Sequence, residues 1–163
     1  MKVVGIDPGT ASCGYGIVHE NGGRLTAVDH GWWTTPAAMR RELRLMTIFE
    51  GVGELIDRHA PDAVVLEESF VGADARTALS VGQARGAVLV AAARAGVACA
   101  EYPPARVKQA VCGYGRAEKQ QVQRMVKAIL GMQAEPTPTH AADALAVAIC
   151  HVFAPPLLEA VTV

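Results

Sequence analysis

Three stretches of this sequence place acidic side chains beside apolar segments. Asp7 follows the apolar run VVGI, and Glu67 follows the apolar run AVVL. His140 and Asp143 stand three residues apart near the start of an alanine-rich stretch, so on a helix they share one face. A carboxylate in such apolar surroundings needs a partner when it is buried. This pattern is typical of acidic ligands held for a cation or a phosphate.

The runs that precede Asp7 and Glu67 are expected to be neighbouring parallel strands, whose carboxyl ends meet at one edge of a sheet. Ligands of open α/β sheets bind at that edge. Crowded carboxylates repel one another unless one stays protonated or a cation lies among them. Oxygen-rich, incompletely caged sites suit Mg²⁺ or Mn²⁺. Two such ions about 4 Å apart can clamp both oxygens of a phosphoryl displacement, so we expect two ions per site.

Each of these residues has an ordinary structural alternative. Asp7 precedes the turn sequence PGT, whose backbone N–H groups it could cap. His140 could be a surface residue, because a helix N-terminus does not favour a protonated imidazole. Asp143 is harder to explain in this way, because alanines surround it on a helix that is apolar enough to be buried.

The chain of 163 residues, 51% hydrophobic and 19% charged, is expected to fold as a single domain spanning residues 1–163. The best apolar run, near residues 86–93, is too short to span a bilayer and ends at Arg94. No signal-peptide pattern follows Met1, so we expect a cytoplasmic protein. The cysteines have no zinc-site spacing and are expected to be reduced and mostly buried: Cys13, Cys99, Cys112 and Cys150.

Apolar periodicity and chain breakers predict an α/β fold with a five-stranded mixed sheet flanked by helices. The first three strands form an antiparallel meander, and the last two return parallel to the first through right-handed crossovers. The strands are expected at residues 3–6, 14–18, 24–33, 63–66 and 97–102. The helices are expected at residues 36–59, 75–95, 105–111, 118–130 and 140–153.

The net charge of −1 hides a basic middle. Residues 76–127 contain nine Lys or Arg residues and two Glu residues, whereas the rest of the chain is acidic. Such an asymmetry is typical of a surface that binds a polyanion. The alternative is a set of solvated helix faces.

With these residues in view, the sequence resembles the RuvC-type Holliday junction resolvases, a branch of the ribonuclease H-like nuclease superfamily. The resemblance covers nearly the whole chain, and its blocks occur in the family's order. These blocks are GIDPGTASCGYGIV, VVLEESF with SVGQARGAVLVAAA, RVKQAVCGYGRAEKQQVQRMV and HAADALAVAICH.

The resemblance implies a homodimeric endonuclease of homologous recombination and DNA repair, which nicks two strands of a four-way junction symmetrically. It further implies Mg²⁺ or Mn²⁺ as cofactor and the RuvA–RuvB branch-migration complex as partner. The implied metal ligands are Asp7, Glu67, Asp143 and His140. Our hypothesis for the mechanism is that Asp7 is shared by two ions and that His140 either completes one metal shell or orients the water. The all-carboxylate form of the motif has Asp where this chain has His140. Since imidazole is a softer ligand than carboxylate, we predict a preference for Mn²⁺.

The implied DNA contacts come from the basic middle and from one aromatic residue. Lys108 and Lys119 match positions near the scissile phosphate, where Lys119 could also stabilise developing negative charge. Phe70 matches an aromatic that stacks on unpaired bases at the crossover; its alternative is a hydrophobic plug for the following helix. Arg76 and Arg116 are further expected DNA contacts.

Three points stay open from the sequence. Gly82 and Gly86, one helical turn apart, suit either a dimer interface or internal packing. An actin-like ATPase opens with a similar strand, but that architecture needs two such domains and is longer than this chain. A non-catalytic junction-binding module of the same fold is a second rival, against which the four ligand-type residues argue. A nicking assay on a synthetic junction separates this module from an enzyme.

Overall fold

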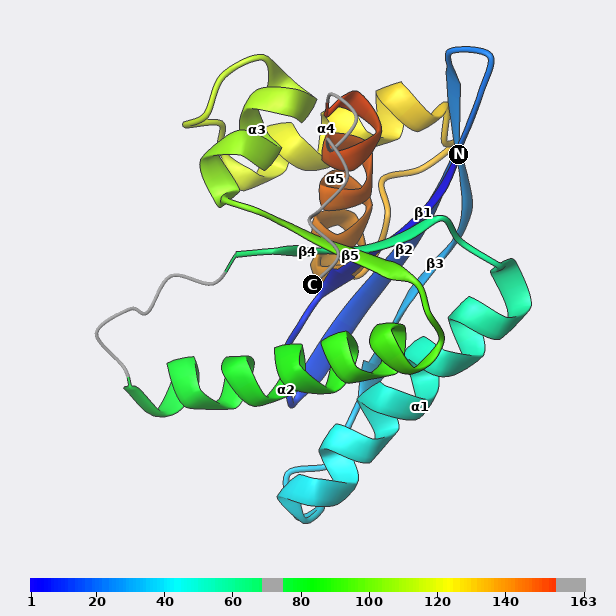
Figure 1. The fold of residues 1–163 in the computed structure, drawn as a ribbon. Coiled ribbons are helices and arrows are strands. Elements are labelled where there is room, and N and C mark those ends of the chain that lie inside the picture. The colour runs from blue at the N-terminus through cyan, green and yellow to red at the C-terminus, as the bar shows by residue number, and fades with distance from the viewer. Residues whose placement is uncertain (69–74, 155–163) are drawn as a thin grey trace.

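A computed structural model describes residues 1–68 and 75–154 of the chain. One five-stranded sheet with the order β3-β2-β1-β4-β5 lies between two groups of helices (Figure 1). Its strands are β1 (Lys2–Asp7), β2 (Ser12–Asn21), β3 (Arg24–Thr34), β4 (Ala63–Glu67) and β5 (Ala98–Tyr102). The helices are α1 (Arg41–His59), α2 (Ala75–Arg94), α3 (Pro104–Cys112), α4 (Lys119–Leu130) and α5 (Thr139–Phe153). None of these helices is long and apolar enough to cross a membrane, within the part of the chain described.

The pairing of the strands confirms the predicted mixed sheet. Strands β1, β2 and β3 pair antiparallel, whereas β4 is parallel to β1 and β5 is parallel to β4. In the register of β1 and β4, Ile6 lies opposite Leu66. The next residue of each strand is a carboxylate, so Asp7 and Glu67 leave the sheet side by side.

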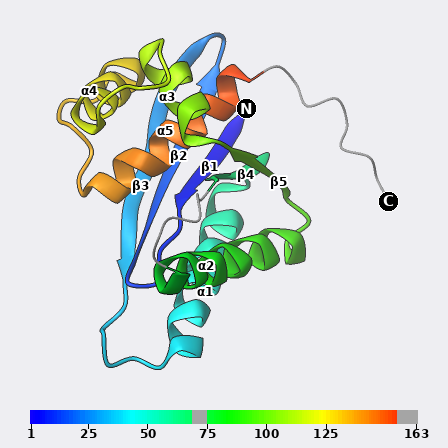
Figure 2. The same cartoon turned by 90° about the vertical axis from the view of Figure 1, so that its left-hand side faces the viewer.

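Alternate residues of the strands feed two separate apolar cores, because successive side chains of a strand point to opposite faces. Figure 2 shows α3, α4 and α5 on one side of the sheet and α1 and α2 on the other. The α5 side is filled by side chains such as Val3, Val65 and Leu145. The α1 side is filled by Ile6, Val64 and Ile48, among others. Both faces of the central strands are therefore buried in apolar side chains.

Helix α5 lies against the backbone of the sheet because the strands beneath it carry glycines. A Cβ atom built at Gly5 would collide with the backbone of Ala144, and one at Gly14 would collide with the backbone of His140. Any larger residue at these positions would push α5 away. The glycines thus bring the first turns of α5 next to the end of β1.

The predicted start of the first helix is wrong by five residues. Helix α1 begins at Arg41, because the preceding segment forms a turn whose carbonyl groups are bound by a side chain. Arg44 donates to the carbonyl oxygens of Pro36 at 2.9 Å and Met39 at 3.1 Å, and also to that of Ala37. The other elements start and end within a few residues of their predicted positions.

All four cysteines are free, but they are less buried than expected. Cys13 and Cys150 are buried, Cys112 is half-buried and Cys99 is exposed. Cys99 lies on β5, which is at the edge of the five-stranded sheet.

Candidate functional site

Three of the four predicted ligands, all but His140, line one pocket of about 190 Å³. Asp7 ends β1, Glu67 ends β4, and Asp143 lies one turn into α5. Lys108 from α3 and Lys119 from α4 also line this pocket. Its apolar wall is formed by Val107, Val122 and Ala146. Residues that are up to 136 positions apart in the sequence are thus brought to one edge of the sheet.

Asp7 is turned towards α5 and does not cap its own turn. Oδ2 of Asp7 lies 2.6 Å from Nδ1 of His140, whose side chain is 43% exposed at the rim of the site. The turn after Asp7 is held by other groups: the Thr35 hydroxyl donates to the Thr10 carbonyl at 2.6 Å, and the hydroxyls of Thr10 and Ser80 lie 2.5 Å apart. Burial raises the pKa of Asp7, and the nearby charge of Asp143 adds to the rise, while the hydrogen bond from His140 opposes it.

The pKa of Glu67 is shifted more strongly than that of Asp7. Burial raises the pKa of Glu67 to about 7, with further contributions from the negative charges of Asp143 and Asp7, against the opposing charges of Lys108 and Lys119. At neutral pH, much of the Glu67 carboxyl is therefore protonated in the metal-free protein. A cation in the pocket would reverse this preference, because it would replace repulsion by attraction.

Helix α2 holds the end of the strand that carries Glu67. Nη1 of Arg85 donates to the backbone carbonyl of Glu67 at 2.6 Å, and Nη2 of Arg85 pairs with Glu101 of β5 at 2.7 Å. Sequence reasoning missed this role of Arg85, because nothing in its local sequence distinguishes it from the other cations of the basic middle. Only the packing of α2 against the sheet reveals it.

Lys119 is ion-paired to Asp143. Nζ of Lys119 lies 2.7 Å from Oδ2 of Asp143, and the lysine side chain is largely exposed. Burial lowers the pKa of Lys119, but the hydrogen bond to Asp143 and the charges of Asp143, Asp7 and Glu67 outweigh it, so the pKa is raised. The amine thus stays charged beside the carboxylates.

The donor set of the pocket fits a hard divalent cation, although the side chains are not yet arranged around one. Within residues 1–68 and 75–154, no three His, Cys, Asp or Glu side chains are positioned to hold an ion as they stand. The reason is visible in the contacts, since Asp7 is bonded to His140 and Asp143 to Lys119. Carboxylate oxygens are nevertheless the ligands that Mg²⁺ and Mn²⁺ prefer. A bound cation would also relieve the repulsion that raises the pKa of Glu67.

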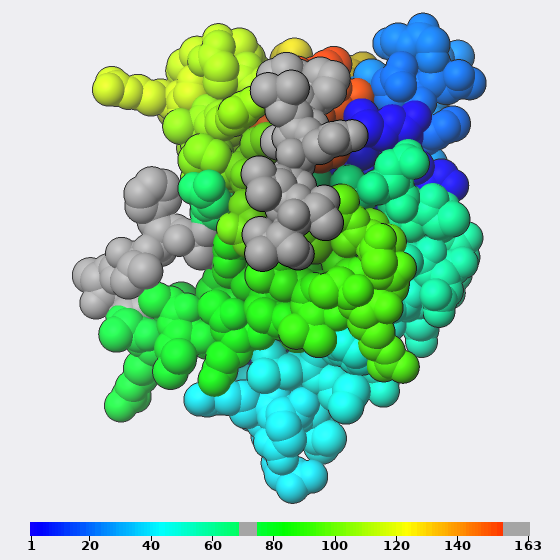
Figure 3. Space-filling view, viewed as in Figure 1, coloured from blue at the N-terminus to red at the C-terminus, as the bar shows by residue number. Residues whose placement is uncertain are grey.

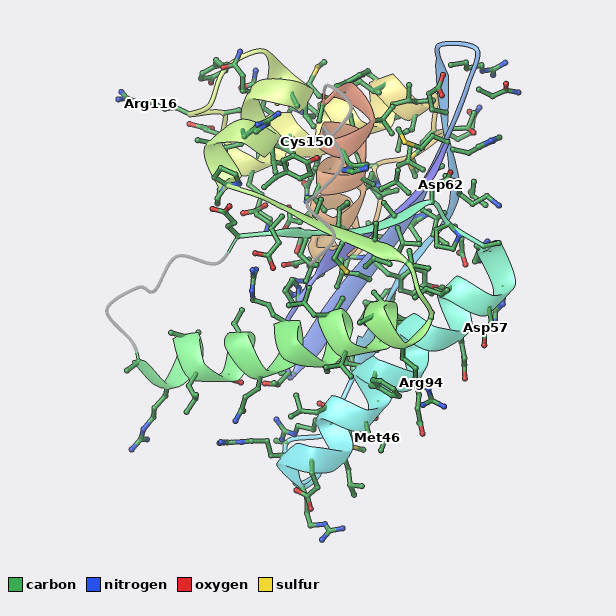
Figure 4. The ribbon with its side chains drawn as sticks, viewed as in Figure 1. Met46, Asp57, Asp62, Arg94, Arg116 and Cys150 are labelled. Carbon is green, nitrogen blue, oxygen red and sulfur yellow. The ribbon has the colours of Figure 1, made fainter. Side chains whose placement is uncertain are left out.

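Of the predicted DNA contacts, only the two lysines line the pocket. Lys108 and Lys119 line it, whereas neither Arg76, in the first turn of α2, nor Arg116 is among the described residues that do so. Arg116 projects outward from the loop between α3 and α4 (Figure 4). Phe70 lies outside the described residues.

Several cations of the basic middle also contact the fold itself. Besides Arg85, two of its cations stack on aromatic rings of the fold: Arg94 lies 5.7 Å from the ring centroid of Phe49, and Arg106 lies 5.3 Å from that of Tyr102. These arginines contribute to packing. Both arginines remain exposed, so their charge still adds to the positive surface.

A comparison with known protein families identifies the family of this chain. The family described as crossover junction endodeoxyribonuclease RuvC matches residues 3–151. The chain belongs to this family. A RuvC-family protein of Chloroflexus aggregans is 50% identical over 159 residues, which cover 98% of this chain and 97% of that protein. One from Rubrobacter xylanophilus is 53% identical over 151 residues, covering 93% and 84%.

Solved structures agree with this assignment. The structure of Thermus thermophilus RuvC matches this RuvC-family chain with a TM-score of 0.86 at 40% identity, covering 94% of both chains. The structure of T. thermophilus RuvC with a Holliday junction substrate gives a TM-score of 0.87 at 39% identity, again over 94% of both. The yeast mitochondrial Holliday junction resolvase Ydc2, at 13% identity and a TM-score of 0.65, shares the fold. The ribonuclease H-like fold and the endonuclease class expected from the sequence are thus confirmed, in a family of metal-dependent nucleases.

Proposed function

We propose that this RuvC-family endonuclease resolves four-way DNA junctions by metal-dependent phosphodiester hydrolysis in the pocket of Asp7, Glu67 and Asp143. The observation that carries the proposal is the meeting of three carboxylates from β1, β4 and α5 with two lysines in one pocket. Carboxylates hold the cations that phosphoryl transfer needs. The positive charges of Lys108 and Lys119 attract a DNA phosphate towards the carboxylates.

The four predicted ligands have distinct roles in this proposal. Asp7, Glu67 and Asp143 would hold two Mg²⁺ or Mn²⁺ ions, with His140 as the fourth ligand. When bound, these ions would polarise the phosphodiester and lower the pKa of the attacking water. His140 fixes the orientation of the Asp7 carboxylate through its 2.6 Å hydrogen bond. Glu67 must lose its proton before it can bind a metal ion, so its site loads more readily above pH 7.

Lys119 has a separate role at the mouth of the pocket. Its ammonium group is paired with Asp143. If Asp143 served as a metal ligand, the ammonium group of Lys119 would be free to contact the phosphate. It would then stabilise the negative charge that develops there during hydrolysis.

The decisive experiment compares two neighbouring glutamates. Glu67 lines the pocket, whereas Glu68 is exposed and makes its backbone contact with Tyr102. We expect Glu67→Gln to abolish nicking of a synthetic four-way junction and Glu68→Gln to leave it unchanged. A linear duplex serves as substrate control, and junction binding without metal should be retained by both variants. Loss of binding together with cleavage in Glu67→Gln would make Glu67 a structural residue and refute the scheme.

The proposed homodimer has a suitable surface on the outer face of α1 and α2. These helices lie side by side at the surface of the molecule (Figure 3). Four apolar side chains there are 44–59% exposed: Leu43, Met46, Leu79 and Val90. A Cβ built at Gly82 or Gly86 would meet no described atom within 4 Å, so these glycines do not serve internal packing in the described chain. An exposed apolar face of this kind marks an interaction surface.

Sedimentation tests the dimer. We expect wild-type protein to sediment as a dimer and Leu79→Glu to sediment as a folded monomer. A wild-type monomer at micromolar concentration would contradict the proposal.

On family membership alone, we further propose the cytoplasm as the site of action and the RuvA–RuvB complex as a partner.

A further inference from the structure

Trp32 lies on the edge strand β3 at the level of the candidate site. The strand register pairs Asp7 with Gly14 and Gly14 with Trp32, so these three residues form one row across the sheet. Residues directly opposite each other on antiparallel strands point to the same face. Asp7 stands on the α5 face, as its bond to His140 shows. Trp32 therefore stands on the same face, two strands or roughly 10 Å from Asp7.

The start of α5 fills the space between Asp7 and Trp32. The middle residue of the row, Gly14, has no side chain, and a Cβ atom there would touch the backbone and Cβ of His140. His140 thus lies directly over Gly14, with Asp7 on one side and Trp32 on the other. The indole of Trp32 flanks the site without lining its pocket.

The two adjacent tryptophans have opposite roles. Trp33 faces the α1 side, where its ring lies 4.9 Å from that of Tyr15 and where a Cβ atom on Gly51 would collide with it. Trp32 is 48% exposed on the site side of the sheet. Trp33 therefore belongs to the core, whereas a large part of the Trp32 surface is available to a ligand.

We propose that Trp32 stacks on a nucleobase of the DNA strand whose phosphate enters the pocket. The inference rests on the proposed cleavage at Asp7, because a strand that crosses His140 from this pocket reaches Trp32 next. Aromatic rings stack on unpaired bases with little regard to sequence. Bases next to a junction's branch point are the ones available for such contact. Trp32 is thus a DNA-binding residue that adds an apolar contact to the charged ones of Lys108 and Lys119.

Intrinsic fluorescence gives a direct test, since the chain contains only two tryptophans. In the cleavage-deficient Glu67→Gln background, Trp33→Phe leaves Trp32 as the sole tryptophan. We expect its emission to be quenched as four-way junction is added, with weaker quenching by linear duplex. The matched variant Trp32→Phe, which keeps only the core Trp33, should show little change. Equal quenching of both variants, or none for Trp32, would overturn the proposal.

Binding and cleavage assays test the stacking itself. We expect Trp32→Ala and Trp32→Leu to weaken junction binding about five- to tenfold, at the lower end of what stacking contributes, and Trp32→Phe to restore most of it. Thermal midpoints and single-turnover cleavage at saturating enzyme should stay near wild type. A lower single-turnover rate with unchanged binding would mean that Trp32 only positions His140, which refutes stacking. Failure of the wild type to cleave would refute the proposed function, whereas the quenching experiment would still test Trp32.

Discussion

Helix α5 carries a histidine near each end, and each one is hydrogen-bonded to the last residue of a strand. At the N-terminal end, Nδ1 of His140 lies 2.6 Å from the Asp7 carboxylate. At the C-terminal end, Nδ1 of His151 lies 2.8 Å from the Tyr102 hydroxyl. The two contacts look alike, but their surroundings differ in charge.

The N-terminal contact lies among like charges. Asp7, Glu67 and Asp143 share one pocket, and their repulsion and burial raise the pKa values of Asp7 and Glu67. The C-terminal contact is free of this conflict: Tyr102 is buried, Arg106 lies over its ring, and burial lowers the pKa of His151. The N-terminal end of α5 thus carries a destabilising cluster of carboxyl groups that forms the candidate site, whereas the C-terminal end stabilises the fold. Substitutions at the two ends should separate activity from stability.

The largest effect is expected at Asp7. Asp7→Asn should abolish junction cleavage, since an amide is a poor ligand for Mg²⁺ or Mn²⁺. The same change removes the negative charge of one of three crowded carboxyl groups, so the thermal midpoint of the metal-free protein should equal or exceed that of the wild type. Nicking and thermal-melting measurements on one preparation check both effects. A midpoint that falls together with activity would show that this end also supports the fold.

His140→Asp tests the metal preference at the same end. An all-oxygen site is harder than one with an imidazole, so the ratio of activity in Mn²⁺ to activity in Mg²⁺ should fall severalfold in this variant. Cleavage rates measured in each metal at saturation give the ratio. Equal wild-type activity in the two metals, with no change on substitution, would remove His140 from the ligand set.

The charge conflict at Glu67 should appear as a pH dependence of stability in the absence of metal. The pKa of Glu67 rises from 4.5 to about 7 on folding, so between these values the folded state binds more protons than the unfolded state. The free energy of unfolding therefore falls as pH rises through this window. We expect the fall to be smaller in Glu67→Gln by about 1 kcal/mol, after allowance for partial solvation of the side chain.

Urea unfolding at pH 5 and pH 7.5, with chelator present, measures this difference. The other titrating groups are common to both proteins, so their contributions largely cancel. An identical pH dependence in the two proteins would mean that the Glu67 carboxyl has an ordinary pKa.

The smallest effect is expected at the other end of α5. His151→Phe keeps an aromatic side chain but removes the hydrogen bond to Tyr102, which should lower the free energy of unfolding by about 1 kcal/mol. Cleavage of the junction should be unchanged. Urea unfolding measures the change in stability, and the nicking assay measures cleavage. A loss of cleavage without a loss of stability would show that the two ends of α5 do not differ in this way.

The sequence by itself determined most elements and the main carboxylates. Apolar runs and breakers located the strands, and the position of Asp7 and Glu67 after two such runs predicted that they meet, because parallel neighbours end at one edge. The three-residue spacing of His140 and Asp143 placed both on one face of α5. The motif blocks indicated the family. All of this information is local in the chain.

The tertiary structure alone decided which partner each of these groups has. Three hydrogen bonds join residues that are distant in the sequence. Asp7 and His140 are 133 positions apart, Lys119 and Asp143 are 24 apart, and Arg85 is 18 from Glu67, whose carbonyl group it binds. Such contacts depend on strand register and helix packing, which side-chain type and spacing do not encode. The later start of α1 has the same kind of cause, because the side chain of Arg44 binds the carbonyls of a turn. The place of Trp32 beside the site likewise follows from a register that only the folded sheet defines.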